Sequence, residues 1–166
     1  AINPEQPTVV IAGSPNVGKS QLVAKISTAK PRVAVYPFTT QEISVGTFEK
    51  KYFRYQVVDT PGLLDRPLEE RNSFELRGIL ALKHLADLVI FMFDPTETCG
   101  YPMSEQEHLL KQIREQFSTV PIIEVENKAD LTKSKDERLK ISASTGYNVT
   151  KLIDRIVAAL KAQQPL

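Results

Sequence analysis

Cysteine is nearly absent from this sequence, with Cys99 the only one among 166 residues. A disulfide within the chain and a zinc site built from several thiolates are therefore excluded, and a single thiol is typical of a reducing compartment. Disulfides are also not needed, because a chain of this length can bury about two thirds of its unfolded surface. We therefore expect a folded protein that is not secreted.

Long apolar runs and an excess of one charge are missing too. The longest apolar tract, residues 88–93, is far shorter than the ~18 to 20 residues that cross a bilayer. Basic residues number 21 and acidic residues 20, which leaves a net charge of +1. Such totals predict no broad field for nucleic acid or membrane. Residues 1–7 lack the order of a signal peptide and are expected to be a linker.

What the chain does contain is an alternation of short apolar runs and helical stripes. The runs predict six strands, at residues 8–12, 43–49, 52–59, 88–94, 121–127 and 139–142. Helical spacing predicts helices over residues 20–26, 67–86, 104–117 and 148–162. This order predicts an α/β fold of three layers, with a mostly parallel six-stranded sheet, one antiparallel strand and helices on both faces.

The segments between these elements carry further expectations. Residues 30–41 contain prolines and paired threonines without either period, which predicts an extended loop. Residues 130–142 are polar and leave room for about one or two helical turns. Ser104 and Glu107 are expected to form a capping box at the start of their helix.

A phosphate-binding loop follows the first predicted strand. Residues 13–20, Gly-Ser-Pro-Asn-Val-Gly-Lys-Ser, fit the P-loop pattern G-x-x-x-x-G-K-[ST] between a strand and a helix. In such a loop the backbone N–H groups and the helix N-terminus face phosphate oxygens. We expect Lys19 to reach the β- and γ-phosphates and Ser20 to bind Mg²⁺. The nucleotide contacts predicted here are Gly13, Asn16, Val17, Gly18, Lys19, Ser20 and Gln21.

The string Asn127-Lys-Ala-Asp130, directly after a predicted strand, favours guanine over adenine. A carboxylate only accepts hydrogen bonds, so Asp130 can receive two N–H donors of guanine, whereas adenine would leave this buried group poorly paired. We expect Asn127 to hold neighbouring loops and the base, and the Lys128 stem to pack on the ring. The segment whose backbone is expected to cover the base carbonyl oxygen is Ser142, Ala143 and Ser144.

Two further segments are expected to reach Mg²⁺ and the γ-phosphate. Asp59 ends a predicted strand and can hold Mg²⁺ through water, and the N–H of Gly62 can approach the γ-phosphate. Thr39 and Thr40 are both candidates for the hydroxyl that completes the Mg²⁺ shell, and we favour Thr40. The predicted catalytic residues are Lys19, Thr40 and Gly62, and the predicted metal contacts are Ser20, Thr40 and Asp59.

The motifs so far resemble those of GTPases, and the residue after Gly62 argues against a fast one. Small GTPases have a glutamine there that orients the attacking water, whereas this chain has Leu63, which cannot hydrogen-bond water. We expect intrinsic hydrolysis near or below about 10⁻⁴ to 10⁻³ s⁻¹. Asn16 matches the asparagine that helps to hold K⁺ in potassium-activated relatives. The other interpretation is that Asn16 only bonds backbone groups of its own loop.

In chain order, these motifs are those of GTPase domains. Residues 36–40, 59–72, 81–86 and 94–101 resemble the Obg group of GTPases, and more narrowly its nucleolar GTP-binding protein branch, often called Nog. The resemblance implies one GTP-binding domain over residues 1–166, as a fragment of a longer protein with helical flanks. It implies a GTP/GDP switch in large-subunit ribosome assembly, with rRNA and ribosomal proteins as partners. The location would be cytoplasmic in archaea and nucleolar in eukaryotes.

Other functions stay open at this point. A nucleotide kinase would share the P-loop but have no use for residues 127–130. A G domain that regulates a membrane transporter, and a partner-binding module that never hydrolyses GTP, both fit the motifs. Membrane contact is not expected, and the domain is expected to be a monomer, with a GTP-dependent dimer left open.

The remaining polar residues are expected to be structural. We expect His84, His108 and Cys99 to lie at the surface or in packed loops, because neither a second metal ligand nor a base accompanies them. Residues 133–140 are rich in basic side chains but interrupted by two acidic ones, which favours a solvated face over an RNA site. Arg66 and Arg71 are candidates for partner or phosphate contacts.

Overall fold

The structure, a computed structural model, describes residues 2–36 and 42–161. Its elements are β1 (Thr8–Ala12), α1 (Lys19–Ile26), β2 (Arg32–Val35), β3 (Glu42–Lys50), β4 (Phe53–Asp59), η1 (Leu68–Glu70), α2 (Ser73–Leu85), β5 (Leu88–Phe93), α3 (Met103–Gln116), β6 (Ile122–Glu126), β7 (Leu139–Lys140) and α4 (Val149–Lys161). The strands form one sheet in the order β2-β3-β4-β1-β5-β6-β7. β3 pairs antiparallel with β2 and β4, and the other pairs are parallel. The predicted α/β fold with one antiparallel strand is confirmed.

The sheet has seven strands, so the prediction of six was wrong. The additional strand, β2, lies within the segment 30–41 that was predicted to be a loop. It pairs on one side only, with residues 42–45 of β3, and most of its residues are exposed. An edge strand buries little apolar surface, which is why the sequence lacks the pattern that marks the other strands.

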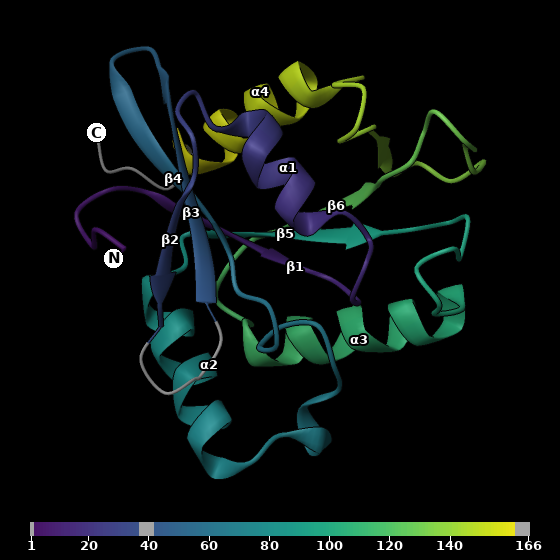
Figure 1. The fold of residues 1–166 in the computed structure, drawn as a ribbon, viewed down its shortest axis with the longest axis horizontal. Coiled ribbons are helices and arrows are strands. Elements are labelled where there is room, and N and C mark those ends of the chain that lie inside the picture. Colours follow the sequence, from purple (N-terminus) through teal and green to yellow (C-terminus); the bar gives the residue numbers. More distant parts are fainter. Residues whose placement is uncertain (1, 37–41, 162–166) are drawn as a thin grey trace.

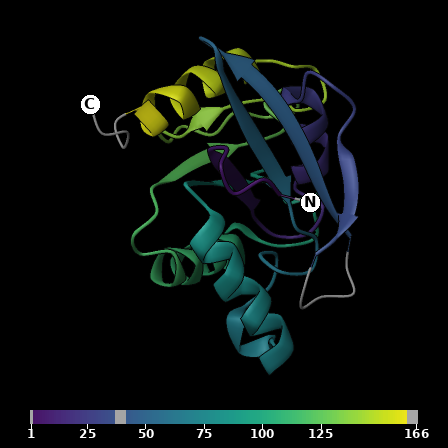
Figure 2. The ribbon, with the colours of Figure 1, turned by 90° about the vertical axis from the view of Figure 1, so that its left-hand side faces the viewer.

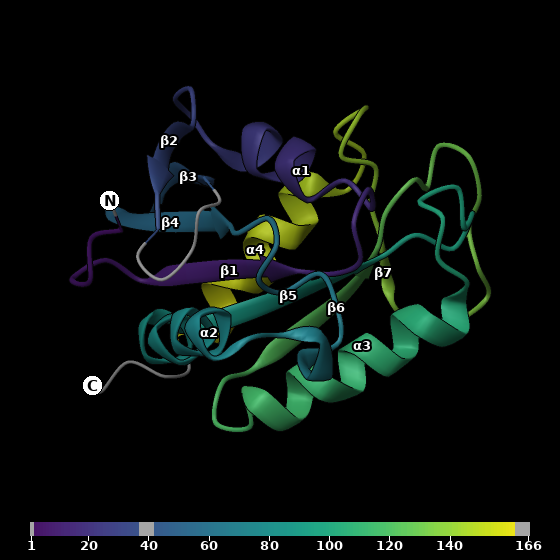
Figure 3. The same cartoon turned by 60° about the horizontal axis from the view of Figure 1, so that its bottom comes forward.

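Helices cover both faces of the sheet, with α1 and α4 on one face and α2 and α3 on the other (Figures 1 and 3). Figure 2 shows the same layers from the side. All six residues of β5 are buried, and successive residues contribute alternately to the cores on the two faces. Burial on both faces explains the continuous apolar runs of the central parallel strands.

Helix starts differ from the prediction in two places. The single helix expected over 67–86 is divided into η1 and α2, because Asn72 and Glu75 form a capping box at the start of α2. The capping box predicted at Ser104 and Glu107 is wrong. α3 begins one residue earlier, after Pro102, and its first N–H donates to the Glu97 carboxylate at 2.6 Å.

The connection between residues 130 and 139 begins with one turn, in which the N–H groups of Leu131 and Thr132 donate to the Lys128 carbonyl oxygen, and it contains no helix. β7 is shorter than the strand predicted over 139–142. Ion pairs hold this segment in place of a packed helix. Arg138 contacts Glu107 at 2.6 Å and Glu124 at 2.8 Å, and its guanidinium lies 4.0 Å from the centre of the Phe93 ring. Among the described residues, no helix is long and apolar enough to cross a membrane.

Candidate functional site

The predicted phosphate residues lie together at the carboxyl ends of the central strands. β1 ends at Ala12, the loop follows, and α1 begins at Lys19. The chain leaves β1 between β4 and β5, which is the position where α/β sheets commonly bind ligands. A cavity of about 440 Å³ opens there. It is lined by Pro15, Asn16, Gly18, Lys19, Ser20, Gln21, Asp59, Pro61 and Asp65.

Two glycines of this loop allow a backbone path that other residues would block. Gly13 has φ 146°, and a Cβ there would lie 2.6 Å from the carbonyl oxygen of Met92. Gly18 has φ 110°, and a Cβ there would lie 2.3 Å from Nδ2 of Asn127. Since a positive φ also disfavours side chains, both positions require glycine for the loop to pack against its neighbours.

Lys19 and Asp59 place opposite charges in the phosphate cavity. The Lys19 Nζ donates to the carbonyl oxygens of Gly13 at 2.8 Å and Ser14 at 2.9 Å, and burial lowers its pKa while Asp59 opposes that shift. Burial raises the pKa of Asp59 to about 6, again opposed by the other charge. Within the described chain, Asp59 Oδ1 is buried without a hydrogen-bond partner. The cavity therefore has a charged donor for anions and an unpaired acceptor.

Asn127 joins three loops that are distant in sequence. Its Nδ2 donates to the carbonyl oxygen of Val17 at 2.8 Å, and its Oδ1 accepts from the N–H of Ala143 at 2.9 Å. The side chain is buried, and its own N–H donates to Phe93 at the end of β5. The structure thus brings together the P-loop, the 127–130 loop and the 142–144 segment, which is the part of the expectation for Asn127 that concerns neighbouring loops.

Asp130 lies on the rim of this region. It is exposed, whereas a buried carboxylate was expected. The residue before it, Ala129, is buried, and Asp130 is the first exposed residue after β6. Its Oδ1 accepts from Ser142 Oγ at 2.8 Å, and Ser142 lies 3.1 Å from Ser144. A neighbouring hollow of about 360 Å³ is lined by Gln21, Ala24, Lys25, Ala143 and Ser144. A base placed there would meet Ala143 and Ser144, and Ser142, the residue before them, holds the Asp130 carboxylate.

The segment after Asp59 contains a carboxylate that the sequence interpretation missed. The Gly62 N–H, predicted to face the γ-phosphate, donates to Asp65 Oδ2 at 3.0 Å. Arg71 is fully buried and contacts Asp65 at 3.1 Å and Glu75 at 3.0 Å. It also donates to the carbonyl oxygen of Leu63 at 2.9 Å. A buried arginine requires several acceptors, but nothing in the sequence indicates which ones.

Two other predicted positions have different outcomes. The Leu63 side chain is buried in the core on the α2 face, so it does not line the phosphate cavity. Thr39 and Thr40 lie outside the described residues. The residue before that segment, Tyr36, is buried, and its hydroxyl donates to the carbonyl oxygen of Gly78 in α2 at 3.2 Å.

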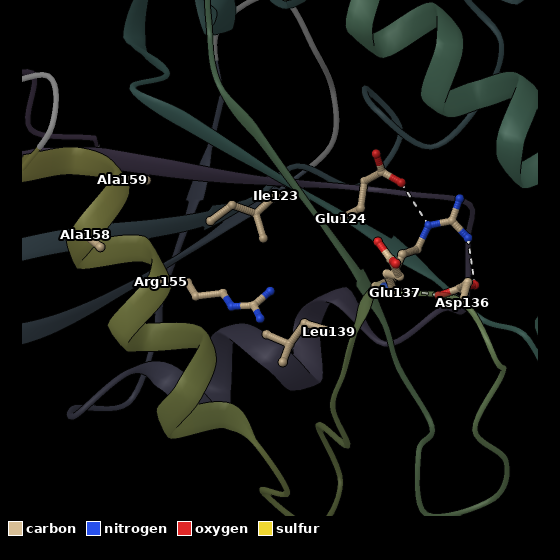
Figure 4. Close-up of a pocket in the computed structure, with 9 residues that line it drawn as sticks. Ile123, Glu124, Asp136, Glu137, Leu139, Arg155, Ala158 and Ala159 are labelled. Atoms are coloured by element: carbon tan, nitrogen blue, oxygen red, sulfur yellow. Dashed lines mark hydrogen bonds and ion pairs between the residues drawn. The ribbon is translucent and has the colours of Figure 1, made fainter.

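A larger hollow of about 790 Å³ lies between α4 and the β6–β7 edge, away from the phosphate loop (Figure 4). Part of its charged wall is already paired, since Arg138 contacts Glu124 at 2.8 Å and Asp136 at 3.2 Å. Lys140 likewise contacts Asp136 at 2.6 Å. The basic residues that were weighed as an RNA site are therefore partly neutralised, and the smaller phosphate cavity is the better candidate.

The remaining candidates contribute no chemistry to the site. His84 and His108 are exposed, and burial raises the pKa of the Cys99 thiol, which keeps it protonated. Across residues 2–36 and 42–161, no group of three or more histidine, cysteine or acidic side chains could hold a metal ion.

Comparison with known proteins agrees with these features. Residues 73–130 match the family model of nucleolar GTP-binding protein 1. The chain is 44% identical over 135 residues to nucleolar GTP-binding protein 1 of Drosophila melanogaster, which covers 81% of this chain and 21% of the relative. It is 52% identical over 134 residues to an uncharacterised protein of Methanocaldococcus jannaschii, covering 81% and 36%. The matched region is thus about a third or less of these relatives' length.

Solved structures show the same relationship. A crystal structure of nucleolar GTP-binding protein 1 from Plasmodium falciparum matches with a TM-score of 0.86 and 32% identity, covering 99% of this chain and 91% of that one. The G domain of the FeoB iron transporter of T. maritima matches with a TM-score of 0.76 and 29% identity, covering 93% and 99%. Both solved structures are similar to this chain in fold. Only the first bears the name of the family whose model matches residues 73–130. The chain belongs to the nucleolar GTP-binding protein 1 family, in the Nog branch of Obg-type GTPases, and has its GTP-binding G domain.

Proposed function

We propose that this chain is a magnesium-dependent switch that binds GTP, hydrolyses it slowly and acts in assembly of the large ribosomal subunit. The observation that carries the proposal is Asn127, which joins the P-loop to the 142–144 segment through contacts of 2.8 and 2.9 Å. These contacts join the P-loop to the segments that would recognise guanine. One nucleotide can then engage both.

The residues at the phosphate cavity fit a Mg²⁺ ion. Asp59 Oδ1 is a buried acceptor without a described partner, which suits a metal-bound water, and Ser20 lines the same cavity. Asp59, Ser20 and Thr40 would hold the ion together with phosphate oxygens. When bound, Mg²⁺ neutralises charge that develops on the β- and γ-phosphates.

Hydrolysis would transfer the γ-phosphoryl group to water. The water oxygen forms a bond to the γ-phosphorus as the bond to the β–γ bridging oxygen breaks, which yields GDP and inorganic phosphate. Lys19 would leave its two carbonyl partners for phosphate oxygens, since a charged acceptor binds an ammonium more strongly. Leu63 is buried and offers no group to orient water, which supports a slow intrinsic rate.

Switching would use the Gly62 N–H. In the structure it bonds Asp65, whereas a γ-phosphate would compete for the same donor. Displacing Asp65 would also remove one partner of the buried Arg71 and so alter the segment before α2. A partner that binds only one arrangement of this segment would then respond to the nucleotide.

The role in ribosome assembly is supported by the family. Relatives named for the nucleolus match this chain more closely in sequence and fold than the FeoB G domain does. Because the nucleolus is the eukaryotic site of ribosome assembly, we favour this role over transporter regulation. A eukaryotic member would be nucleolar and an archaeal one cytoplasmic, with pre-ribosomal rRNA and proteins as partners.

Turnover in two salts tests the enzymatic part. We would measure GTP hydrolysis by the chain with Mg²⁺ in KCl and in NaCl at equal ionic strength. Slow turnover in both salts is expected if a partner supplies activation, and no turnover above the rate in buffer would overturn the enzymatic assignment. A rise in KCl that is lost in Asn16→Ala would assign K⁺ binding to Asn16, which lines the cavity.

Sedimentation tests the ribosomal part. The full-length protein would be incubated with large-subunit precursors from its own cells, with a non-hydrolysable GTP analogue or with GDP. Co-sedimentation that depends on the analogue is expected for a switch. If the protein does not co-sediment with the precursors in either nucleotide, the ribosomal role is contradicted. The assignment of GTP binding would not be affected by that result.

A further inference from the structure

An ion pair joins the loops that follow β5 and β6. Asp94 comes directly after β5, and one oxygen of its carboxylate lies 2.6 Å from the Nζ of Lys128, which follows β6. The Asp94 side chain is fully buried and that of Lys128 is 21% exposed. Lys128 is the residue whose stem is expected to pack on the base, so its anchor bears on the base site.

The Asp94 carboxylate is saturated with donors. Its Oδ2 also accepts from the Cys99 N–H at 2.8 Å, and its Oδ1 accepts from the Thr96 N–H at 2.9 Å. Burial alone would raise the pKa of Asp94, but the hydrogen bonds from Lys128 and Thr96 outweigh it and lower the pKa. The group is therefore a buried anion whose one charged partner in the described chain is Lys128.

The backbone of Asp94 is held separately from its carboxylate. The Asp94 N–H donates to Gln106 Oε1 at 2.8 Å, and Gln106 Nε2 donates back to the Asp94 carbonyl oxygen at 3.0 Å. α3 thus fixes the end of β5 by itself. A change confined to the carboxylate should leave the end of the strand in place and act on the groups that the carboxylate holds.

Fixing the ammonium also fixes the stem that leads to it. The Lys128 backbone has φ 63°, and its Nζ is held by both Asp94 and Thr98 Oγ1, the latter at 2.9 Å. A free lysine side chain has four rotatable bonds, and ordering them on binding would reduce affinity. A stem that is already ordered presents its apolar face to a ligand without that cost.

We propose that Asp94 is a positioning residue for guanine recognition, which anchors the Lys128 ammonium so that the Lys128 stem forms a preset wall of the base site. The inference rests on the proposed GTP binding and adds to it a residue outside the nucleotide motifs. Asp94 acts only through Lys128, so its effect on nucleotide affinity depends on the lysine charge.

A double-mutant cycle tests this dependence. Fluorescent GDP would be titrated into the wild type, Asp94→Asn, Lys128→Met and the double variant. We expect Asp94→Asn alone to weaken GDP binding about tenfold, and to change it less than about threefold when Lys128 is already Met. Equal losses in both backgrounds, or wild-type affinity in Asp94→Asn, would overturn the inference.

Matched variants separate positioning from folding. Asp154→Asn makes the same change in an exposed ion pair with Lys50 at 3.6 Å, and it should keep wild-type affinity because neither residue lines the phosphate cavity. If Asp94→Asn does not fold, Thr98→Val combined with Lys128→Met tests the same anchor, and additive losses there would also overturn it. A wild type that does not bind GDP would overturn the proposed function itself, whereas binding without coupling would overturn only this inference.

Discussion

At the scale of single residues, the site depends on charges held away from water. Lys19 and Asp59 line one cavity. Burial lowers the pKa of Lys19 and raises that of Asp59, so it favours the neutral form of each side chain. The charge of each residue opposes the pKa shift of the other. Phosphate and Mg²⁺ would add further charged partners. Asp59 Oδ1 is thus a buried acceptor for which the described chain supplies no partner, on the same cavity as Lys19.

The raised pKa of Asp59, about 6, predicts a pH dependence. Magnesium-dependent GTP affinity should rise as pH increases through about 6, because the carboxylate that holds the metal-bound water forms there. The linked stability has the opposite sign: it is present below the unfolded value near 3.8 and is lost as pH rises through about 6. GTP titrations with Mg²⁺ at several pH values between 5 and 8 would measure the first effect.

The control for this prediction is Asp59→Asn, which cannot titrate. Its GTP affinity should be low and nearly constant over the same range. A wild type whose affinity does not change across pH 6 would contradict the assignment of Asp59 to the metal.

Replacing Asp130 by Asn tests recognition of the base. The amide places a donor where guanine also donates, so GTP affinity should fall by at least about a hundredfold. Xanthosine triphosphate offers an acceptor at that position and should bind the variant better than GTP does. Competition titrations with both nucleotides would check this, and unchanged GTP affinity would remove Asp130 from the base site.

At the scale of elements, the segment between β4 and α2 is held by one carboxylate and one arginine. Asp65 accepts from the Gly62 N–H and from Arg71, and Glu75 at the start of α2 provides a second partner for Arg71. Asp65→Asn should raise the ratio of GTP to GDP affinity severalfold, because a γ-phosphate no longer displaces a charged acceptor. Parallel titrations of both nucleotides measure the ratio.

Arg66→Ala is a useful comparison, because Arg66 is half-exposed and lies 3.8 Å from the same carboxylate. Its effect on the ratio should be small, since exposed ion pairs contribute little. A ratio that is unchanged in Asp65→Asn would show that Asp65 does not compete with the γ-phosphate.

The segment between residues 130 and 139 is held by the ion pairs of Arg138. Arg138→Ala should lower the free energy of unfolding by about 2 kcal/mol, because it removes ion pairs to Glu107, Glu124, Asp136 and the buried Glu126, which then keeps only the cation of Lys140, at 3.5 Å, among the described residues. Urea denaturation would measure this. Lys133→Ala, which removes a contact to the exposed Tyr147, should change stability by less than about 0.5 kcal/mol, and equal losses would contradict the role of Arg138.

At the scale of the whole molecule, strands buried on both faces could be predicted because their apolar runs are continuous, as in β5. The P-loop could be placed because its spacing and its position between strand and helix are fixed by chemistry. The edge strand β2 could not, since it buries few side chains. The contacts of Asp65 and Arg138 could not either, because ion pairs between loops follow from tertiary packing and not from local periodicity.

The central claim is that this chain selects guanine nucleotides, and competition against labelled GDP tests it most directly. Unlabelled GTP and ATP would be titrated against the complex of the chain with fluorescent GDP and Mg²⁺. GTP should displace the label at concentrations at least about a hundredfold lower than ATP. Displacement by ATP at the same concentrations as GTP would contradict the account.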